Sequence, residues 1–280
     1  MRLPQNFWTY FFGLAFSLAL AFCFHETLDA REFPGTKTDW NGFDCYNFVL
    51  DGRNARVVAP KEPAPGKPWI WRAVFFGHEP QTEIAMLHKG WYVAWISTSD
   101  LLGSDKCNQE RSNLYNFLTE EYGLNPKPVL LGMSRGGLCS LRWAIANPDK
   151  VSALYIDAPV CDLKSWPGGK GKGVGSPQDW AQAQQVYGLS EEQLLNFDGM
   201  PIVACKTLAE RKIPILLIAG DADRVVPYDE NGAILVENYQ KVGGPIEVII
   251  KPGVDHHPHS LKDPARIVDF IEKHAPQGNF

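Results

Sequence analysis

The stretch Gly132-Met133-Ser134-Arg135-Gly136-Gly137 decides the fold. The apolar run 128–131 precedes it, and apolar residues recur at helical spacing after it until Asn147-Pro148 ends the pattern. We therefore predict a strand that turns sharply into a helix, with a Gly-x-Ser-x-Gly motif in the turn. Such a turn holds its serine in a strained backbone conformation and exposes the hydroxyl at the end of a sheet. Ser134 is thus the candidate nucleophile, against the alternative of a glycine-rich turn with an incidental serine.

Two glycines and the start of the predicted helix suit this role. Gly132 and Gly136 have no Cβ that would collide where the helix folds back on the strand. The first turn of the helix also offers backbone N–H groups to a developing negative charge. The N–H of Arg135 is therefore a candidate oxyanion donor.

The composition fits one large α/β domain. The chain has 280 residues, of which 45% are hydrophobic and 21% charged, as in soluble globular proteins. Its formal net charge of -5 leaves no strongly basic surface, and no run of like charge indicates a disordered tail. We predict no nucleic-acid partner.

Residues 1–30 resemble a secretory signal peptide. Residues 7–24 are almost wholly apolar, Arg2 precedes them, and Ala30 is a candidate cleavage site. We therefore predict a secreted or periplasmic protein, residues 31–280, without stable membrane association after cleavage. The alternative is an uncleaved anchor, since the run is near the lower bound of about 18 residues for a membrane span.

The cysteines predict neither a zinc knuckle nor a dense disulfide framework. Cys23 lies in the predicted signal, which leaves an odd number and no Cys-x-x-Cys pair. One disulfide is compatible with the remaining set, which is Cys45, Cys107, Cys139, Cys161 and Cys205.

Strands and helices alternate after residue 31, as a parallel sheet requires. Residues 43–58 contain the turn signal Asp51-Gly52 and predict two antiparallel edge strands. Residues 69–76 follow a proline-rich link and predict a buried strand. Further strands are predicted at 91–96, 151–156, 213–219 and 246–250. Helices are predicted at 82–89, in a segment that ends at about Tyr122-Gly123, and from Asp263-Pro264 onward. The pattern predicts an α/β fold with a mostly parallel central sheet and helices on both faces.

The alternation breaks between Cys161 and Met200. Residues 166–175 are too glycine-rich to pack, and residues 179–195 are helical in pattern but polar. We predict an inserted loop and helix at about 162–200 above the sheet, where they would shape a substrate pocket. A flexible surface loop is the alternative for the glycine-rich part.

The tryptophans divide by position. Trp166, Trp40 and Trp180 are free to face a ligand, and Trp166 belongs to the insertion. The tryptophans in predicted core elements are expected to be structural, and these are Trp71, Trp91, Trp95 and Trp143.

Ser134 needs a base, because a serine hydroxyl is a poor nucleophile until its proton is taken. Asp223 follows the predicted strand 213–219, and His256 follows the predicted strand 246–250. Both therefore lie at the end of the sheet that carries the serine. His256 would accept the serine proton, and Asp223 would hold the imidazole tautomer and stabilise its cation.

Each assignment has rivals. His257 or His259 could replace His256, and Asp221 or Asp157 could replace Asp223. A histidine cluster could also suggest a metal, but no Glu or Cys lies at ligand spacing, and the serine motif already accounts for a histidine here. We predict no metal and no cofactor.

The serine motif, the run Gly-Asp-Ala-Asp-Arg-Val-Val-Pro and the late histidine resemble the α/β-hydrolase superfamily over nearly the whole chain after the signal. This resemblance implies that the loop after the strand 69–76 supplies a second oxyanion donor, from the amides around Phe76 and Gly77. A narrower similarity, to secreted bacterial hydrolases of the carbohydrate-esterase type, rests on Phe-Phe-Gly-His-Glu-Pro, Gly-Met-Ser-Arg-Gly-Gly, Ser-Trp-Pro-Gly-Gly-Lys-Gly and His-His-Pro-His-Ser-Leu.

Arg135 carries a further resemblance. It directly follows the serine, as in glucuronoyl esterases, where that arginine helps to stabilise the oxyanion; this chain has Met133 where they have cysteine. Its side chain could stabilise the oxyanion, bind a substrate carboxylate, or pair with Glu79.

The resemblance implies a serine carboxylic-ester hydrolase that works through an acyl-enzyme. We predict that it removes acyl or methyl esters from a small-molecule or glycan substrate. A peptidase on the same fold and a catalytically silent binding protein are the alternatives, and the intact triad argues against the second.

Overall fold

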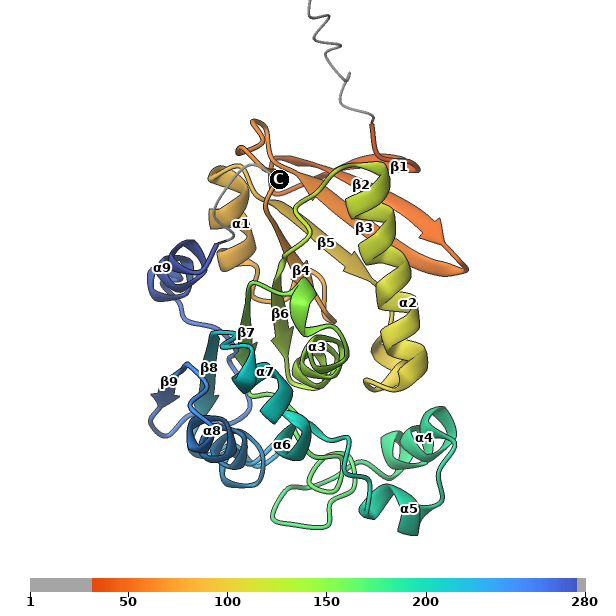
Figure 1. Cartoon of the computed structure of the whole chain (residues 1–280), viewed down its shortest axis with the longest axis vertical. Helices are drawn as coiled ribbons and strands as arrows, with labels where there is room; N and C mark the ends of the chain where they lie inside the picture. The colour runs from red at the N-terminus through yellow and green to blue at the C-terminus, as the bar shows by residue number, and fades with distance from the viewer. Residues whose placement is uncertain (1–31, 276–280) are drawn as a thin grey trace, which may run out of the picture. The chain divides into compact units, whose positions relative to one another are not determined.

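Nine strands form one sheet in the part of the chain that the computed structural model describes, residues 32–275 (Figure 1). Their order is β1-β2-β3-β5-β4-β6-β7-β8-β9, antiparallel from β1 to β5 and parallel from β5 to β9. The strands are β1 (Thr36–Trp40), β2 (Phe43–Leu50), β3 (Arg53–Ala59), β4 (Trp69–Arg72), β5 (Tyr92–Ile96), β6 (Val129–Met133), β7 (Ala153–Asp157), β8 (Ile215–Gly220) and β9 (Ile246–Lys251). The predicted signal, residues 1–30, lies outside the described residues.

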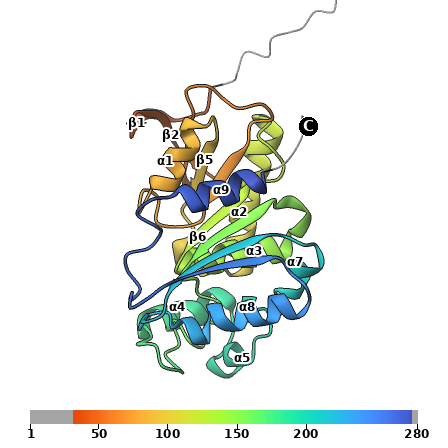
Figure 2. The same cartoon turned by 90° about the vertical axis from the view of Figure 1, so that its left-hand side faces the viewer.

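Helices cover both faces of the sheet (Figure 2). Helices α1 and α9 pack together on one face, and α2, α3 and α8 lie on the other. The helices are α1 (Gln81–His88), α2 (Asp105–Asn116), α3 (Arg135–Ala146), α4 (Pro177–Tyr187), α5 (Glu191–Leu195), α6 (Pro201–Ala204), α7 (Lys206–Glu210), α8 (Gly232–Lys241) and α9 (Ala265–Lys273), with 3-10 turns at Ser99–Leu101, Pro148–Lys150 and Tyr228–Glu230 and a π turn at Phe117–Glu121. This arrangement confirms the predicted α/β fold.

Side chains that alternate in direction along the buried strands form a hydrophobic core on each face of the sheet. On β6, Leu130 packs in the cluster that α2, α3 and α8 share, whereas Val129 and Leu131 pack in the cluster of α1 and α9. Successive strand side chains point to opposite faces, so a strand buried on both faces is apolar throughout. The apolar runs in the sequence are therefore the central parallel strands.

The amino-terminal hairpin is confirmed, but its two strands are not at the edge of the sheet, because β1 lies outside β2. Strands β2 and β3 pair around Asp51-Gly52, whose positive φ angles of 48° and 81° suit a two-residue turn. Strand β1 pairs with β2 but is not predicted by the sequence, because its residues are largely exposed and polar.

Strand β4 is shorter than the predicted strand 69–76. It ends at Arg72, and the chain then turns, with φ of 53° at Phe75 and 84° at Gly77. Ala73 and Val74 remain buried beneath this turn, which explains why the apolar run is longer than the strand.

The last helix buries the four residues that the sequence indicated, Ile267, Val268, Phe270 and Ile271. The helix begins at Ala265, whose N–H is 3.0 Å from Oδ1 of Asp263. Pro264 occupies the N-cap position instead of Asp263, so the helix begins one residue later than predicted.

Residues 162–200 place α4 and α5 beyond the carboxyl ends of the parallel strands (Figure 1). The expectation that the glycine-rich part cannot pack is wrong. A Cβ added to Gly175 would lie 2.7 Å from the Cα of Gly169, so these glycines pack against each other. The N–H of Val174 donates to the carbonyl of Arg224 at 3.1 Å, which fixes the loop against the segment after β8.

The cysteines of residues 32–275 are all buried and form no disulfide with one another. No helix in this part of the chain is long and apolar enough to cross a membrane.

Candidate active site

The turn between β6 and α3 holds Ser134 in a strained conformation, with φ of 51° and ψ of -124°. Glycines make this turn possible. A Cβ on Gly132 would lie 2.4 Å from the carbonyl oxygen of Gly136, and one on Gly137 would lie 2.5 Å from the Cβ of Pro159. Gly132 and Gly137 therefore have the least space for a side chain, whereas a Cβ on Gly136 would lie 3.3 Å from its nearest atom.

Ser134, His256 and Asp223 form one hydrogen-bonded chain. The Oγ of Ser134 is 3.0 Å from Nε2 of His256, and Nδ1 of His256 is 2.7 Å from Oδ2 of Asp223. The other carboxylate oxygen of Asp223 accepts the N–H groups of Val225 and Val226, each at 2.8 Å. All three triad residues are at most 8% exposed. The structure thus brings together the three residues that the sequence singled out.

The rival acids brace the loop that carries His256. Oδ1 of Asp221 accepts the N–H of Gly253 at 2.6 Å, and Oδ2 of Asp157 accepts the N–H of Ser260 at 2.8 Å. Burial raises the pKa of the Asp157 carboxyl to about 6, although Lys251 lies 3.8 Å away and opposes the shift. Neither acid is hydrogen-bonded to the imidazole of His256 in the described part of the chain.

Asp255 joins the acid loop to the histidine loop, a role that the sequence analysis missed. Its Oδ1 accepts the N–H groups of Arg224 at 2.9 Å and His256 at 2.8 Å, and its Oδ2 accepts Nε of Arg224 at 2.8 Å. These hydrogen bonds, the one from the Arg224 backbone first, lower the pKa of Asp255 to about 2. The sequence signal available was only an acid directly before the histidine.

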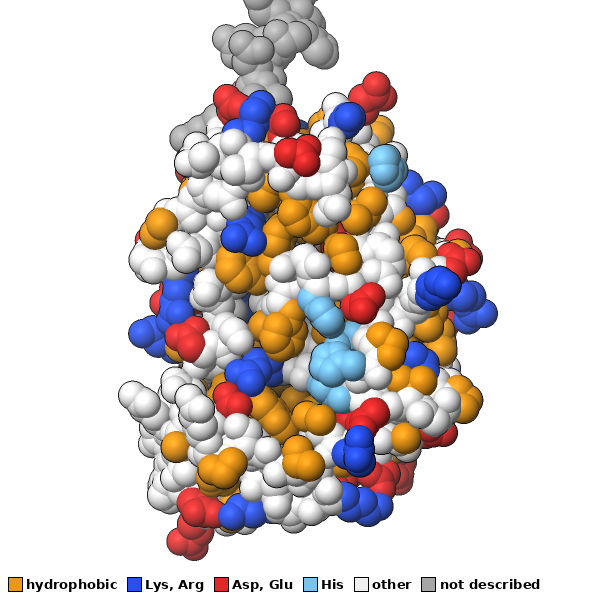
Figure 3. Space-filling view, turned by 180° about the vertical axis from the view of Figure 1, so that it is seen from behind, with side chains coloured by type: hydrophobic (Ala, Val, Ile, Leu, Met, Phe, Trp, Pro, Cys, Tyr) orange, Lys and Arg blue, Asp and Glu red, His pale blue; other side chains and the backbone are white. Residues whose placement is uncertain are grey.

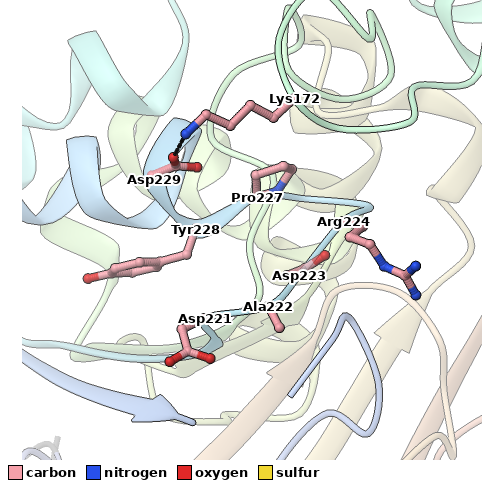
Figure 4. Close-up of a pocket in the computed structure, with 8 residues that line it drawn as sticks. All are labelled: Lys172, Asp221, Ala222, Asp223, Arg224, Pro227, Tyr228 and Asp229. Atoms are coloured by element: carbon pink, nitrogen blue, oxygen red, sulfur yellow. Dashed lines mark hydrogen bonds and ion pairs between the residues drawn. The ribbon is translucent and has the colours of Figure 1, made fainter. Parts of the chain in front are cut away.

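The acid loop is also tied to the insertion. Figure 4 shows Lys172 reaching across to Asp229, with which it forms an ion pair. In the same view the side chain of Arg224 points away from Asp223, which leaves the Asp223 carboxylate to His256.

A pocket of about 470 Å³ opens over Ser134 and His256. Its lining residues are Phe75, Phe76, His78, Ser134, Arg135, Trp166, Val225, His256, His257 and His259. Figure 3 shows histidine side chains gathered in one strip on this face, beside hydrophobic side chains. Of the predicted oxyanion and substrate residues, Phe76, Arg135 and Trp166 line the pocket and Gly77 does not.

The tryptophans differ from the prediction in part. Trp166 lines the pocket although only 6% of its surface is exposed. Trp180 is buried away from the pocket, and Trp40 packs on Phe76 with ring centroids 5.1 Å apart. Trp95 is only partly buried, whereas Trp71, Trp91 and Trp143 are in the core.

Arg72 holds the loop after β4 and was not singled out by the sequence. Its fully buried guanidinium donates to the carbonyl of Val74 at 2.9 Å, to that of Phe75 at 3.0 Å and to that of His78. Glu83 accepts from Nη1 at 2.8 Å. Burial raises the pKa of Glu83, and the Arg72 charge opposes that shift.

Two sets of backbone N–H groups belong to residues in the pocket lining or next to it. The N–H of Arg135 belongs to the first turn of α3 and has no acceptor inside the helix. The N–H groups of Phe76 and Gly77 donate to no acceptor in residues 32–275. These amides stay candidates for the oxyanion hole.

The side chain of Arg135 pairs with the insertion. Its two Nη atoms lie 3.1 and 3.3 Å from the carboxylate oxygens of Asp179 on α4, and its guanidinium carbon lies 4.7 Å from the ring centroid of Trp166. The suggested pair with Glu79 is wrong, because Glu79 accepts from Gln81 at 3.1 Å instead. Arg135 therefore connects the serine turn to both parts of the insertion.

Residues 106–277, more than half of the chain, match the profile of the prolyl oligopeptidase family. The chain belongs to the prolyl oligopeptidase family. This family assignment and the fold identify a member of the α/β-hydrolase superfamily with the architecture of serine hydrolases.

Solved structures of similar fold include both peptidases and an esterase. The acylaminoacyl peptidase of Pyrococcus horikoshii has a TM-score of 0.61 and 18% identity, covering 85% of this chain and 44% of its own. A puromycin-hydrolyzing peptidase of Mycobacterium tuberculosis has a TM-score of 0.61 and 17% identity, covering 82% and 38%. A cold-adapted esterase from an Arctic intertidal metagenomic library has a TM-score of 0.56 and 12% identity, covering 88% and 100%. This prolyl oligopeptidase family member thus spans less than half the length of those peptidases, and the likeness establishes the fold.

Proposed function

We propose that this chain is a serine hydrolase in which Ser134 is the nucleophile, His256 the general base and Asp223 the residue that orients His256. The observation that carries the proposal is the continuous chain from Oγ of Ser134 to Nε2 of His256 at 3.0 Å and from Nδ1 to Asp223 at 2.7 Å. This geometry places a base within proton-transfer distance of the hydroxyl.

The proposed reaction has two half-reactions. Oγ of Ser134 attacks the acyl carbon while its proton moves to Nε2 of His256, and the resulting imidazolium is stabilised by Asp223. The oxyanion is held by the N–H of Arg135 and by an amide of the loop that contains Phe76 and Gly77. The imidazolium protonates the leaving group, and a water activated by the neutral imidazole then hydrolyses the acyl-enzyme.

We propose a carboxylic ester on a glycan, with an acyl or methyl group, as the substrate. The pocket offers an apolar ring to a sugar, because Phe75 lines it and is 39% exposed; Trp166 also lines it but is only 6% exposed. Membership of the prolyl oligopeptidase family favours a peptide substrate as the second candidate.

Matched substrates distinguish the two candidates. We expect the protein to hydrolyse acetyl or methyl esters both of small alcohols and of glycans, and to leave peptide amides uncleaved. Ser134→Ala should abolish both reactions. Cleavage of peptide amides, with no acid released from any glycan, would establish the peptidase instead.

We also propose that residues 1–30 direct export and are removed. The support is the apolar run 7–24 behind Arg2. Mass spectrometry of the amino-terminal peptide of protein recovered from the host's periplasm or medium should find a new terminus at or near Arg31. Recovery of the full-length chain only in membranes would favour the uncleaved anchor.

A further inference from the structure

A second cluster of histidines lies beside the proposed triad. His78 in the loop after β4 and His257 and His259 in the loop after β9 each offer a ring nitrogen, and these nitrogens lie within 4.8 Å of one another. The ring centroids are 4.5 Å apart for His257 and His259, 5.4 Å for His78 and His259, and 5.8 Å for His78 and His257. All three line the pocket that contains Ser134.

The triad does not use these side chains. Both ring nitrogens of His256 are engaged, by Ser134 and Asp223. In the described residues, the side chains of His78, His257 and His259 form no hydrogen bond with either of these two residues. His259 is 3% exposed, and its Nε2 has no hydrogen-bond partner in the described residues. The other nitrogen of this ring, Nδ1, faces Nε2 of His78 and is the one that the cluster offers as a ligand.

The spacing fits one tetrahedral metal ion. Zinc binds imidazole nitrogen at about 2.0–2.1 Å, which puts two ligand nitrogens about 3.3 Å apart. Nε2 of His78 and Nδ1 of His259 are already 3.3 Å apart. Because no pair exceeds 4.8 Å, the widest pair has to close by only about 1.5 Å, which the exposed ring of His257 can supply by rotation.

We propose that His78, His257 and His259 form a site for a divalent transition metal, of which Zn²⁺ is the best fit, at the mouth of the pocket. Three imidazoles without a carboxylate suit zinc rather than Mg²⁺ or Ca²⁺, which prefer oxygen ligands. The fourth coordination position remains for water or a group in the pocket.

The ion inhibits hydrolysis reversibly, an effect that rests on the proposed function. The ring of His256 lies 5.0 Å from that of His257 and 4.8 Å from that of His259, centroid to centroid. A dication held there opposes the positive imidazolium that His256 forms during the reaction, and it also narrows the pocket.

Calorimetric titration of metal-free, untagged protein with ZnCl₂ tests the site without reference to activity. We expect one Zn²⁺ per chain, equal binding by Ser134→Ala, and no binding of Mg²⁺. His257→Ala and His78→Ala should each weaken binding about tenfold or more, whereas His88→Ala, which removes an exposed histidine on α1, should not. Circular dichroism verifies that each variant is folded.

Failure of the site and failure of the proposed function give different results. No zinc binding by the wild type, or the same affinity in His257→Ala, His78→Ala and His88→Ala, overturns the site whatever the enzyme does. If the site binds as expected, saturating Zn²⁺ should lower wild-type ester hydrolysis about tenfold and chelation should restore it. Binding without this loss of rate overturns the inhibitory role.

Discussion

Ser134 has a backbone conformation that non-glycine residues adopt only when their surroundings enforce it, at a cost of about 1–3 kcal/mol. Two close contacts enforce it. A Cβ on Gly132 in β6 would lie 2.4 Å from the carbonyl oxygen of Gly136 in α3, and a Cβ on Gly137 would lie 2.5 Å from Pro159, which follows β7. The sequence predicts the strained serine from its motif. It does not show which flanking glycine is most constrained, because Pro159 follows a different strand.

Gly137→Ala should therefore destabilise the fold more than Gly136→Ala, whose added Cβ would lie 3.3 Å from Val74. We expect a loss of about 1–3 kcal/mol in the free energy of unfolding for Gly137→Ala, because the added methyl group overpacks the turn. Denaturant unfolding of both variants measures the difference. Equal stability of the two would contradict this account of the turn.

Asp157 should make stability depend on pH. Burial raises its pKa from 3.8 to about 6, so the folded state holds this proton more tightly than the unfolded state. Its contribution is fully present below pH 3.8 and is lost as the pH rises through about 6, a change of about 3 kcal/mol. The groups facing its carboxylate are Lys251, Tyr155, His256 and the N–H of Ser260.

Asp157→Asn removes this titration while keeping an acceptor for Ser260. As the pH rises from 5 to 8, the Tm of the variant should increase relative to that of the wild type, because only the wild type loses the contribution of Asp157. Thermal unfolding at matched ionic strength measures this. A difference in Tm that does not change with pH would show that Asp157 is ionised throughout.

At the scale of elements, the loop after β4 is positioned by one side chain. Arg72 holds three carbonyl groups of that loop and pairs with Glu83 on α1, and the side chains of Arg72 and Glu83 are both buried. A planar guanidinium with five donors can satisfy these acceptors together, and a lysine ammonium cannot.

Arg72→Lys should lower kcat with little change in KM, because the charge facing Glu83 remains while the loop amides lose their fixed position. We also expect a loss of about 3 kcal/mol or more in stability from the broken buried network. Steady-state kinetics on a neutral ester and denaturant unfolding measure the two effects. Unchanged kcat in a folded variant would show that the loop amides do not serve the reaction.

The insertion should depend on the pair between Arg135 and Asp179. Both side chains are about one quarter exposed and lie 3.1 Å apart. Arg135→Ala and Asp179→Ala should each raise KM more than they lower kcat, since both release α4 from the pocket. The double variant should be no worse than either single variant, with a coupling energy of about 0.5–3 kcal/mol. Additive losses in the double variant would show that the two residues act independently. A loss of kcat in Arg135→Ala alone would favour a direct contact of the Arg135 side chain with the oxyanion.

The predictability of an element followed its burial. Strands β5 to β8 are recognisable because strands covered on both faces are continuously apolar, whereas the exposed β1 carries no such signal. Helix α8 was missed because it follows the acid loop without a cap that the sequence reveals, and Asn231 at its N-cap position makes no side-chain capping bond. Arg72 and Asp255 were missed because their partners are defined by the folded loops.

For the whole molecule, parallel strands explain how distant residues meet. Ser134 follows β6, Asp223 follows β8 and His256 follows β9, so the carboxyl ends of these strands deliver the triad to one edge of the sheet. The chain order of the triad is therefore readable from the sequence. The approach of His78 to His257 and His259 is not, because it joins loops after β4 and β9 whose separation depends on the twist of the sheet.

Fluorophosphonate labelling followed by peptide mapping tests the central claim most directly, because the reagent modifies a serine only when a base activates it. We expect a single label on Ser134 in the wild type and in His257→Ala, slower labelling by orders of magnitude in His256→Ala, and no label in Ser134→Ala. A wild-type protein that stays unlabelled, or a label that survives in Ser134→Ala, would contradict the assignment of Ser134 as the nucleophile.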